Sequence, residues 1–333
     1  MHRALAKKLF LVMFSCAITC DLPADDGRLQ LVGVQKIWDQ GAHNAFTDLV
    51  RFQGSWFCVF REGAGHVSPD GALRVLKSND GTHWTSAALI ESADSDLRDA
   101  KITTTPDGRL MLAGAEAMND TSLYKHQSLV WFSRNGTDWS LAHEVGDRDN
   151  WLWRVSWNGE TAYGFGYGTK QRGLSFFSVD LQGNSSRLID RVDVPGSYPN
   201  ESSILFPEGP GQPALCLLRQ DGQPNSGFVG SAAPPYTNWL WKKLNMRIGG
   251  PHLIRIPDGR YIASVRLYDG GARTSLCWLD PDSATLSESL KLPSGGDTSY
   301  PGLVWHDEQL WVSYYSSHEG KTSIYLAQVR PVR

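Results

Sequence analysis

Residues 200–219 read NESSILFPEGPGQPALCLLR, and this stretch decides the fold because it contains a complete β-hairpin. Two short apolar runs flank a segment rich in proline and glycine, which cannot continue a strand and therefore forms the turn. A hairpin brings the beginning of its first strand beside the end of its second. Glu201 and Arg219, the charged residues at those two ends, are therefore expected to share one rim of the sheet.

The same unit recurs along the chain at a spacing of about 50 residues, close to the period of a four-stranded propeller blade. Each hairpin is followed by a third strand-like run, and we find no long run with the 3.6-residue period of a helix. The hairpins span residues 46–61, 101–115, 154–167, 201–219, 252–266 and 300–315, and the third strands span residues 72–77, 127–133, 174–179, 227–232, 274–279 and 322–329.

These repeats predict an all-β fold, a six-bladed β-propeller that forms one domain over about residues 30–333. The last strand should close the ring beside residues 30–37. The chain has 333 residues, of which 41% are hydrophobic and 20% charged, which is ordinary for a globular protein. Its formal net charge of -3 gives no general attraction to nucleic acid or to an anionic membrane, so no nucleic-acid partner is expected.

Two of the third strands run into similar turns, SNDGTHW at residues 78–84 and SRNGTDW at residues 133–139. In such a turn an Asp or Asn side chain bonds local backbone N–H groups, glycine adopts a positive φ, and tryptophan covers the turn. The two turns resemble the Asp-box (BNR repeat) of the sialidase, or neuraminidase, superfamily of six-bladed propellers. Both are a short form with glycine directly after the Asp position, and the second has Asn135 in that position.

The N-terminus has the pattern of an export signal, with a basic segment at residues 2–8 and a mostly apolar run at residues 9–18. We expect residues 1–20 to be a signal peptide and the mature protein to be exported, either periplasmic, secreted, or anchored to a membrane. Residues 17–20 form a loose lipoprotein box, so a lipid anchor at Cys20 is one outcome and simple cleavage nearby is the other.

The cysteines that remain after this segment are Cys58, Cys216 and Cys277, each within a strand-like run. Their number is odd and no paired spacing indicates a zinc site or a disulfide, so buried free thiols are expected. The sequence indicates no metal and no cofactor. We expect most of the 13 tryptophans to be structural, since tryptophan locks turns in repeated β folds.

The topology of a propeller collects the starts of the first strands and the ends of the second strands at one mouth of the axis. The long link at residues 62–71 falls on the same face and brings His66 and Asp70. Charges so close to an axis need partners or a ligand, which indicates a functional cleft. The residues expected at this mouth are Asn44, Arg61, Arg98, Asp99, Lys101, Trp153, Arg154, Tyr167, Glu201, Arg219, His252, Arg266, Tyr268 and Tyr300.

The resemblance to sialidases implies roles for several of these residues. Tyr300, in the context Tyr-Pro-Gly-Leu, stands where the family has its nucleophile, and Glu201 stands where a Glu takes the proton of that Tyr. Asp70 matches the acid/base aspartate of the family, with Asp99 as the second choice. The residues expected to contact the substrate are Arg219, Arg266, Arg61, Arg98, Asp99, His66 and Tyr268.

One departure from the family lies in the first inner strand. Sialidases begin that strand with Arg-Ile-Pro, whose arginine is the first of three that bind the substrate carboxylate, and residues 45–47 of this chain read AFT. We expect this arginine to be missing or replaced by Arg61 or Arg98. Four guanidinium groups facing Glu62, Asp99 and Glu201 alone would leave a positive surplus that a bound carboxylate relieves. The alternative is that Arg61 pairs with Glu62 and Arg98 with Asp99, away from the substrate.

The resemblance therefore implies a retaining exo-glycoside hydrolase of the sialidase type, which removes a terminal acidic sugar from a glycan or glycoconjugate. A non-catalytic glycan-binding propeller is an alternative, favoured if Tyr300 is inert and the mouth has no acid. A scaffold for protein partners would have an apolar mouth. A propeller glycosidase or lyase of different sugar specificity also stays open, because Tyr, His and Arg are working groups of lyases as well.

Overall fold

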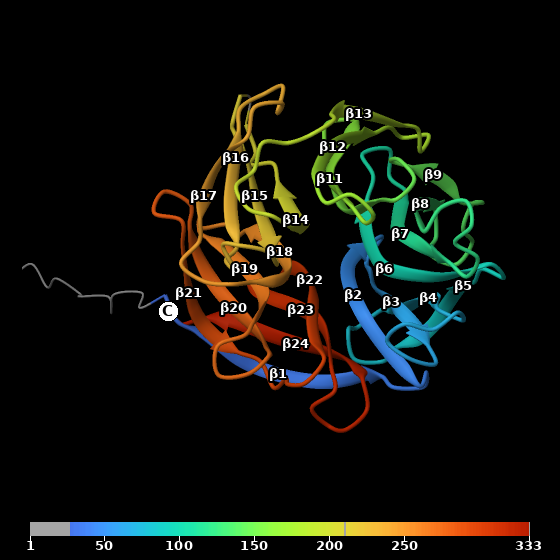
Figure 1. Ribbon diagram of the computed structural model, residues 1–333. Helices are drawn as coiled ribbons and strands as arrows, with labels where there is room; N and C mark the ends of the chain where they lie inside the picture. Colours follow the sequence, from blue (N-terminus) through green and yellow to red (C-terminus); the bar gives the residue numbers. More distant parts are fainter. Residues whose placement is uncertain (1–26, 210, 333) are drawn as a thin grey trace, which may run out of the picture.

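The computed structural model of the protein describes residues 27–209 and 211–332. The predicted signal peptide and its Cys20 lie outside the described residues. Six antiparallel sheets of four strands each stand around a central axis, so the predicted six-bladed β-propeller is confirmed (Figure 1). Among the described residues, no helix is long and apolar enough to cross a membrane.

The first three blades follow one another in the chain, and each runs from the axis outward. Blade 1 consists of β2 (His43–Phe52), β3 (Ser55–Gly63), β4 (Ala72–Ser78) and β5 (Thr85–Ile90). Blade 2 consists of β6 (Ser95–Thr104), β7 (Leu110–Met118), β8 (His126–Ser133) and β9 (His143–Val145). Blade 3 consists of β10 (Asn150–Asn158), β11 (Thr161–Gly168), β12 (Leu174–Val179) and β13 (Ser185–Ile189).

The remaining blades continue the ring, and the sixth takes its outer strand from the N-terminal end of the described chain. Blade 4 consists of β14 (Pro199–Leu205), β15 (Ala214–Gln220), β16 (Phe228–Ala232) and β17 (Leu240–Lys243). Blade 5 consists of β18 (Gly249–Arg255), β19 (Tyr261–Leu267), β20 (Arg273–Asp280) and β21 (Thr285–Lys291). Blade 6 consists of β22 (Thr298–His306), β23 (Gln309–Ser316), β24 (Ser323–Pro331) and β1 (Leu29–Trp38).

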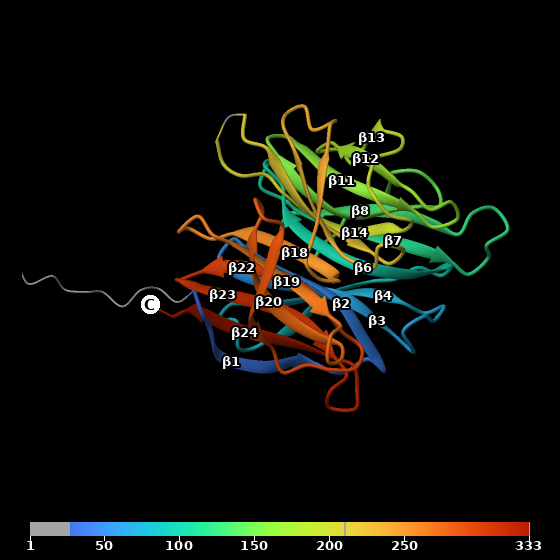
Figure 2. The same cartoon turned by 60° about the vertical axis from the view of Figure 1, so that its left-hand side comes forward.

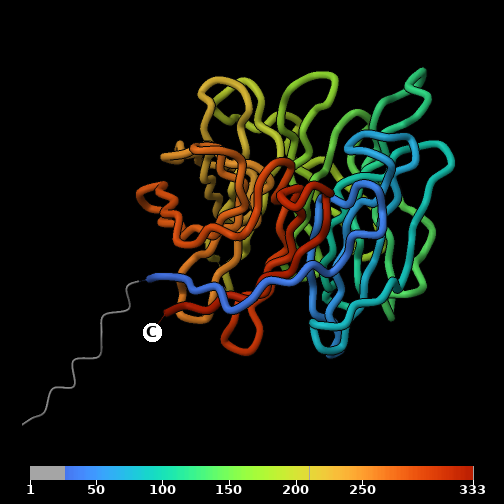
Figure 3. Tube along the Cα trace, turned by 90° about the horizontal axis from the view of Figure 1, so that it is seen from below, coloured from blue at the N-terminus to red at the C-terminus, as the bar shows by residue number. Residues whose placement is uncertain are grey.

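The ring closes where β1 pairs antiparallel with β24, with Leu29 opposite Pro331 and Trp38 opposite Ile324. The expected closure beside residues 30–37 is therefore confirmed. Figure 2 shows β22, β23, β24 and β1 side by side, and Figure 3 shows the blue N-terminal trace running along the red C-terminal one. Closure of this kind ties the two ends of the ring into one sheet and leaves only short protected edges.

The two turns singled out in the sequence have the expected hydrogen bonds. Asp80 Oδ1 accepts the backbone N–H groups of Thr82 and His83, both at 2.8 Å, and Gly81 has a φ of 75°. In the second turn Asn135 Oδ1 accepts the corresponding two N–H groups at 3.0 and 2.9 Å. An Asn therefore serves as well as an Asp here, because the turn needs only an acceptor oxygen.

The three cysteines of the described chain are buried and free, as expected. Cys58 packs in the cluster near the axis, Cys216 lies among the aromatic side chains between blades 3 and 4, and Cys277 lies in the cluster shared by blades 4 and 5. Each packs among apolar side chains, from a second or third strand of its blade, so these thiols contribute packing.

One feature of the backbone positions the site. Near its start, every inner strand has a β-bulge in which two residues oppose one residue of the second strand. Bulges re-aim side chains and concentrate next to active sites. Four bulge residues have a positive φ: Phe46, Asp99, Gly250 and Tyr300. The six bulged pairs, in blade order, are 46–47, 99–100, 153–154, 200–201, 250–251 and 300–301.

Candidate active site

The centre of the mouth holds a tyrosine, a glutamate and an arginine in direct contact. The Tyr300 hydroxyl donates a short hydrogen bond to Glu201 Oε1. Arg219 Nη1 lies 2.8 and 2.9 Å from the two Glu201 oxygens and 3.0 Å from the Tyr300 hydroxyl. The N–H of Gly250 donates to Glu201 Oε2 at 2.8 Å. The contact between Glu201 and Arg219 at one rim, expected from residues 200–219, is present.

Burial and the Glu201 charge both raise the pKa of Tyr300 well above its ordinary value of 10.0, against the opposing effect of Arg219. The hydroxyl is therefore neutral at physiological pH and its proton lies on the bond to the Glu201 carboxylate. A neutral hydroxyl that donates to a carboxylate is the arrangement of a nucleophile with its general base. The Tyr300 ring is fixed between Phe46 and Trp153, at centroid distances of 5.1 and 5.8 Å.

Arg266 flanks the same tyrosine, with its guanidinium 5.2 Å from the ring centroid of Tyr300. Its Nε donates to Thr298 O at 2.6 Å, and its Nη2 donates to the Tyr315 hydroxyl at 2.8 Å and to Asp297 Oδ1 at 3.3 Å. These bonds hold two of the three guanidinium nitrogens and leave Nη1 as the nitrogen available to a ligand. Arg219 and Arg266, from two adjacent blades, thus both contact Tyr300.

Asp99 occupies the bulge of blade 2, where burial raises its pKa and Glu201 lies near enough for the charge of that carboxylate to raise it further. Asp99 is 7% exposed. Its carboxylate has no hydrogen bond or ion pair to any residue that the structure describes. Burial raises the pKa of Asp99, although the nearby Lys101 and Arg98 oppose that shift. A carboxyl with a raised pKa beside a charged carboxylate is the pattern of a general acid.

Asp70, the first choice for the acid, lies elsewhere in its loop. Its side chain is exposed, and Oδ1 and Oδ2 accept the N–H of Ala64 at 3.2 and 3.1 Å. Hydrogen bonds from Ser68 and Ala64 lower the pKa of Asp70. This carboxylate is therefore turned into its own loop and held in the charged form, whereas Asp99 is buried in the bulge of blade 2.

Arg61 was expected to contact the substrate, and the structure instead buries it completely. Its Nε donates to Asp96 Oδ1 at 2.6 Å, Nη1 donates to Gly65 O at 2.7 Å, and Nη2 donates to Ser68 Oγ at 2.9 Å. All three nitrogens are taken by the chain, so Arg61 anchors the loop at residues 62–71. It is also not paired with Glu62, whose carboxylate binds Arg74 and Trp38.

Two other predicted residues, Arg98 and Tyr268, lie around the mouth. Arg98 donates to Asp96 Oδ2 at 3.1 Å and to His66 O at 3.0 Å, with its guanidinium 5.3 Å from the ring centroid of Phe46. Arg98 therefore pairs with Asp96, and the alternative pairing with Asp99 that the sequence left open is not formed. Tyr268 stacks under Arg247 at 4.0 Å, and its hydroxyl is buried without a hydrogen bond to the described residues.

Several residues that complete the site were not identified from the sequence. Asp297 binds Arg266, Asp221 binds both Arg219 (2.9 Å) and Arg247 (3.1 Å), and Asp96 binds Arg61 and Arg98. Each aspartate lies within three residues of a predicted mouth residue, at the same end of a strand. A position at a strand end is the sequence signal that these aspartates share with the predicted cations.

The floor of the site is a buried charged cluster on the axis. Arg154 Nη1 donates to Asp48 Oδ2 at 2.9 Å and lies 3.4 Å from His252 Nε2. Below it the axis widens into a cavity of about 550 Å³ that opens toward the Gly turns. Burial, and then the charge of Arg154, lower the pKa of His252 well below its usual value, so this imidazole is neutral. His252 therefore belongs to the floor rather than to the rim.

Comparison with known proteins shows which solved structures have a similar fold. No family model matches the chain, and no curated protein matches its sequence. A protein of unknown function from Dyadobacter fermentans DSM 18053 has a similar structure, with a TM-score of 0.81 and 18% identity over 92% of this chain and 100% of its own. The GH93 α-L-arabinofuranosidase of Fusarium graminearum, solved with arabinobiose, has a TM-score of 0.71 and 13% identity over 90% of this chain and 98% of its own.

A sialidase from Trypanosoma rangeli is a further structural neighbour, with a TM-score of 0.65 and 12% identity. The alignment covers 86% of this chain and 55% of the sialidase, so the present chain spans about half the length of that enzyme. At these identities the likeness establishes the fold. The expected resemblance to sialidase-like six-bladed propellers is therefore confirmed, and the neighbours of this fold include propeller glycoside hydrolases.

Proposed function

We propose that this protein is a retaining exo-glycoside hydrolase that removes a terminal acidic, sialic-acid-like sugar from a glycan. The observation that carries the proposal is the hydrogen bond from the buried Tyr300 hydroxyl to Glu201, with Arg219 Nη1 at 3.0 Å from the same hydroxyl. A structural tyrosine would not need a carboxylate and a guanidinium converging on its oxygen at the axis of a propeller.

The chemistry follows from the placement of the groups. The Tyr300 oxygen attacks the anomeric carbon while its proton passes to Glu201, and Asp99 gives a proton to the departing oxygen of the aglycone. The anomeric carbon is then bound to Tyr300. A water molecule attacks this intermediate, giving its proton to Asp99, and the tyrosine oxygen recovers its proton from Glu201. Two displacements at one carbon retain the anomeric configuration.

An acidic sugar is favoured by the nucleophile itself. A carboxylate nucleophile would be repelled by a substrate carboxylate next to the anomeric carbon, whereas the neutral Tyr300 hydroxyl is not. Arg219 and Arg266 stand on either side of it, and guanidinium groups bind carboxylates through charge-assisted hydrogen bonds. The Trypanosoma rangeli sialidase, solved with 2,3-difluorosialic acid as a covalent intermediate, is one precedent on this fold.

A glycosidase for a neutral sugar is the second candidate, and two observations favour it. Arg266 is already paired with Asp297, and residues 45–47 read AFT where sialidases have Arg-Ile-Pro with their first carboxylate-binding arginine. The arabinofuranosidase with the same fold was solved with arabinobiose, a neutral ligand. An assay panel must therefore contain acidic and neutral sugars with the same leaving group.

The test is hydrolysis of aryl glycosides by the wild-type protein and by Tyr300→Phe. Tyr300→Phe should keep the fold and lower turnover by about three or more orders of magnitude, because the covalent nucleophile is lost. The matched control is Tyr325→Phe, since Tyr325 is also buried and its hydroxyl also contacts a glutamate, Glu319 at 3.0 Å, but lies away from the axis.

A fluorinated glycosyl fluoride of the preferred sugar provides direct evidence for the intermediate. Mass spectrometry of digested protein should place the added sugar on the peptide that contains Tyr300. Near-normal turnover of Tyr300→Phe, or labelling of another residue, would contradict the proposed mechanism. If the panel shows a neutral sugar as the preferred substrate, the second candidate replaces the first while the mechanism stands.

A further inference from the structure

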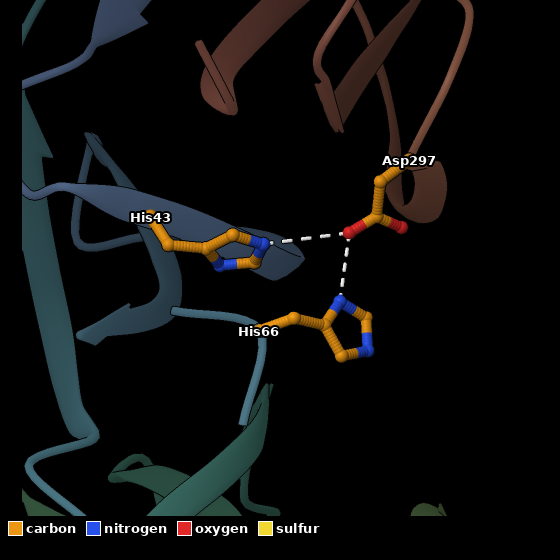
Figure 4. A group of neighbouring side chains, drawn as sticks. All are labelled: His43, His66 and Asp297. Carbon is orange, nitrogen blue, oxygen red and sulfur yellow. Dashed lines mark hydrogen bonds and ion pairs between the residues drawn. The ribbon is translucent and has the colours of Figure 1, made fainter. Parts of the chain in front are cut away.

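His43, His66 and Asp297 form a compact cluster at the seam between blades 1 and 6. His43 begins β2, His66 lies in the loop at residues 62–71, and Asp297 directly precedes β22. His66 Nδ1 lies 2.8 Å from Asp297 Oδ2, and His43 Nε2 lies 3.4 Å from the same oxygen (Figure 4). The three ligand atoms lie within 4.8 Å of one another. Two imidazole nitrogens and one carboxylate oxygen thus converge on one point.

The carboxylate of Asp297 is oriented for this cluster by its other oxygen. Oδ1 accepts the Tyr315 hydroxyl at 2.7 Å and Arg266 Nη2 at 3.3 Å, which leaves Oδ2 for the two histidines. Asp297 thus has one oxygen held by Tyr315 and Arg266 and the other oxygen directed at the two imidazoles.

The cluster is both accessible and close to the nucleophile. The side chain of His66 is 50% exposed, so an ion can enter from the solvent and keep an open coordination position. The His66 ring packs edge-on against Phe46 at 5.2 Å, and Phe46 packs against Tyr300 at 5.1 Å. Arg98 also lies against Phe46, with its guanidinium 5.3 Å from the ring centroid, and donates to the backbone oxygen of His66 at 3.0 Å. The cluster is therefore linked to Tyr300 through a single aromatic ring, that of Phe46.

We propose that His43 Nε2, His66 Nδ1 and Asp297 Oδ2 bind one divalent transition-metal ion of the zinc class. Imidazole and carboxylate suit zinc, and three protein ligands with one open position are the usual set of a zinc site that meets a substrate. The open position would take an oxygen of the substrate. This role in substrate binding rests on the proposed function, whereas the metal site itself does not.

The ring nitrogen that must carry the imidazole proton distinguishes the strong ligands from the weak one. A neutral imidazole carries one proton, which must leave the nitrogen that binds the ion and move to the other ring nitrogen. For His66 the receiving nitrogen, Nε2, has no hydrogen bond to the described residues and reaches the solvent with its half-exposed ring. For His43 the receiving nitrogen, Nδ1, is buried without a partner in the described chain, so an N–H there is left unpaired. His66 and Asp297 are therefore the strong ligands, and His43 is the weak one.

The test is zinc binding by the full mature chain without an affinity tag and without substrate. Isothermal titration with Zn²⁺ and elemental analysis after dialysis should give one ion per chain, and Co²⁺ should give the visible absorption of a site with nitrogen and oxygen ligands. His66→Ala and Asp297→Asn should each weaken binding by more than the roughly 10- to 100-fold that changes around a ligand cause. His43→Ala should weaken it less.

His318→Ala is the matched control, because His318 lies after β23, contacts Ser316, and is not part of the cluster. The control should bind zinc as the wild type does. Zinc bound far below one ion per chain, or binding that His66→Ala leaves unchanged, would overturn the proposal and leave the cluster as a hydrogen-bonded His–Asp–His network.

The role in substrate binding is separated from the site by a second measurement. Chelation should raise KM for an acidic sugar more than for its neutral analogue, and leave kcat of the neutral analogue nearly unchanged. A protein that binds zinc but hydrolyses no glycoside would contradict the proposed function and keep the metal site. A protein that hydrolyses acidic glycosides equally with and without zinc would contradict the role in substrate binding.

Discussion

Replacing Lys101 by methionine should make the protein more stable at neutral pH and less active. Lys101 directly follows the bulge of β6 and is only 3% exposed. Its ammonium lies 4.8 Å from the ring centroid of Trp153 and 6.0 Å from that of Tyr300, and it donates to Ala100 O at 3.1 Å. A buried ammonium beside Tyr300 is a feature that stability alone would not select.

The magnitude follows from the pKa. Burial, and next the charge of Arg154, lower the pKa of Lys101 from 10.5 to about 8, although Asp99 and Asp48 oppose the shift. Each pKa unit corresponds to about 1.4 kcal/mol, so the charged form costs the folded state about 3 kcal/mol below pH 8. Methionine has a similar length and no charge. It forfeits about 1 kcal/mol of cation–π attraction, which leaves a net gain of about 2 kcal/mol.

The lowered pKa of Lys101 also determines whether the free energy of unfolding rises or falls with pH. Between about pH 8 and pH 10.5 the unfolded chain keeps the lysine proton while the folded protein has lost it, so the free energy of unfolding rises with pH. The wild type should therefore gain about 3 kcal/mol from this group across that window. Lys101→Met should lack this gain, because it has no proton to lose.

The assay is urea unfolding followed by tryptophan fluorescence, at pH 7 and at intervals up to pH 10.5. A suitable control is Lys243→Met, a change to an exposed lysine of β17, which should match the wild type at every pH. Activity of Lys101→Met should fall, because the positive charge near Asp99 and Glu201 is removed. A variant less stable than the wild type at pH 7, or one that keeps the full rise with pH, would refute the reasoning.

Three further predictions concern the acid, the loop and export. Asp99→Asn should slow substrates with poor leaving groups about 100-fold more than those with good ones, whereas Asp70→Asn should leave both near wild-type rates in the same assay. Arg61→Ala should lower the free energy of unfolding by about 3–5 kcal/mol in calorimetry, because Asp96 keeps a buried charge without its main partner. Mass spectrometry of protein from the native host should show that residues up to about 19 are absent, and an intact N-terminus would contradict export.

The architecture could be predicted from the sequence because it depends on short-range signals. Turn residues and apolar runs placed each second and third strand within one to three residues of its observed bounds, as in the hairpin of β14 and β15. Tyr300, Glu201 and Arg219 could be brought together because propeller topology fixes which strand ends meet. These inferences needed only the order of strands and the side of the ring on which each end lies.

The assignment of partners could not be predicted, because it depends on side-chain direction across blades. Arg266 is paired with Asp297 from the next blade, and Arg61 with Asp96 from the next blade, rather than with acids on their own hairpins. The positive surplus expected at the mouth therefore shrinks: Arg219, Arg266, Arg61 and Arg98 each have a carboxylate. Sequence spacing within one hairpin carries no information about such contacts.

The bulges explain why the backbone conformation of the site residues could not be predicted from local sequence preferences. Phe46, Asp99 and Tyr300 are non-glycine residues with φ between 51° and 64°, a conformation that costs an ordinary L-residue about 1–2 kcal/mol. Local propensity would place glycine there, as at Gly250 in blade 5. Tyr300 is held in this conformation by contacts from elsewhere in the ring, since its carbonyl accepts the Thr47 hydroxyl at 2.8 Å and its own hydroxyl binds Glu201.

Such contacts form only after neighbouring blades have packed, so the strain is sustained by the closed ring and not by the hairpin that contains it. In this conformation the Phe46 ring lies 5.1 Å from the Tyr300 ring. Burial and Glu201 raise the pKa of Tyr300, and Asp99 lies near enough to add to that rise. An ordinary strand would instead direct alternate side chains into the gaps between blades. Positions where a sequence departs from local preference in this way are expected to be functional. That Asp99 shares this strained position with Tyr300, whereas Asp70 lies in an exposed loop, is the structural reason to assign the proton donor to Asp99.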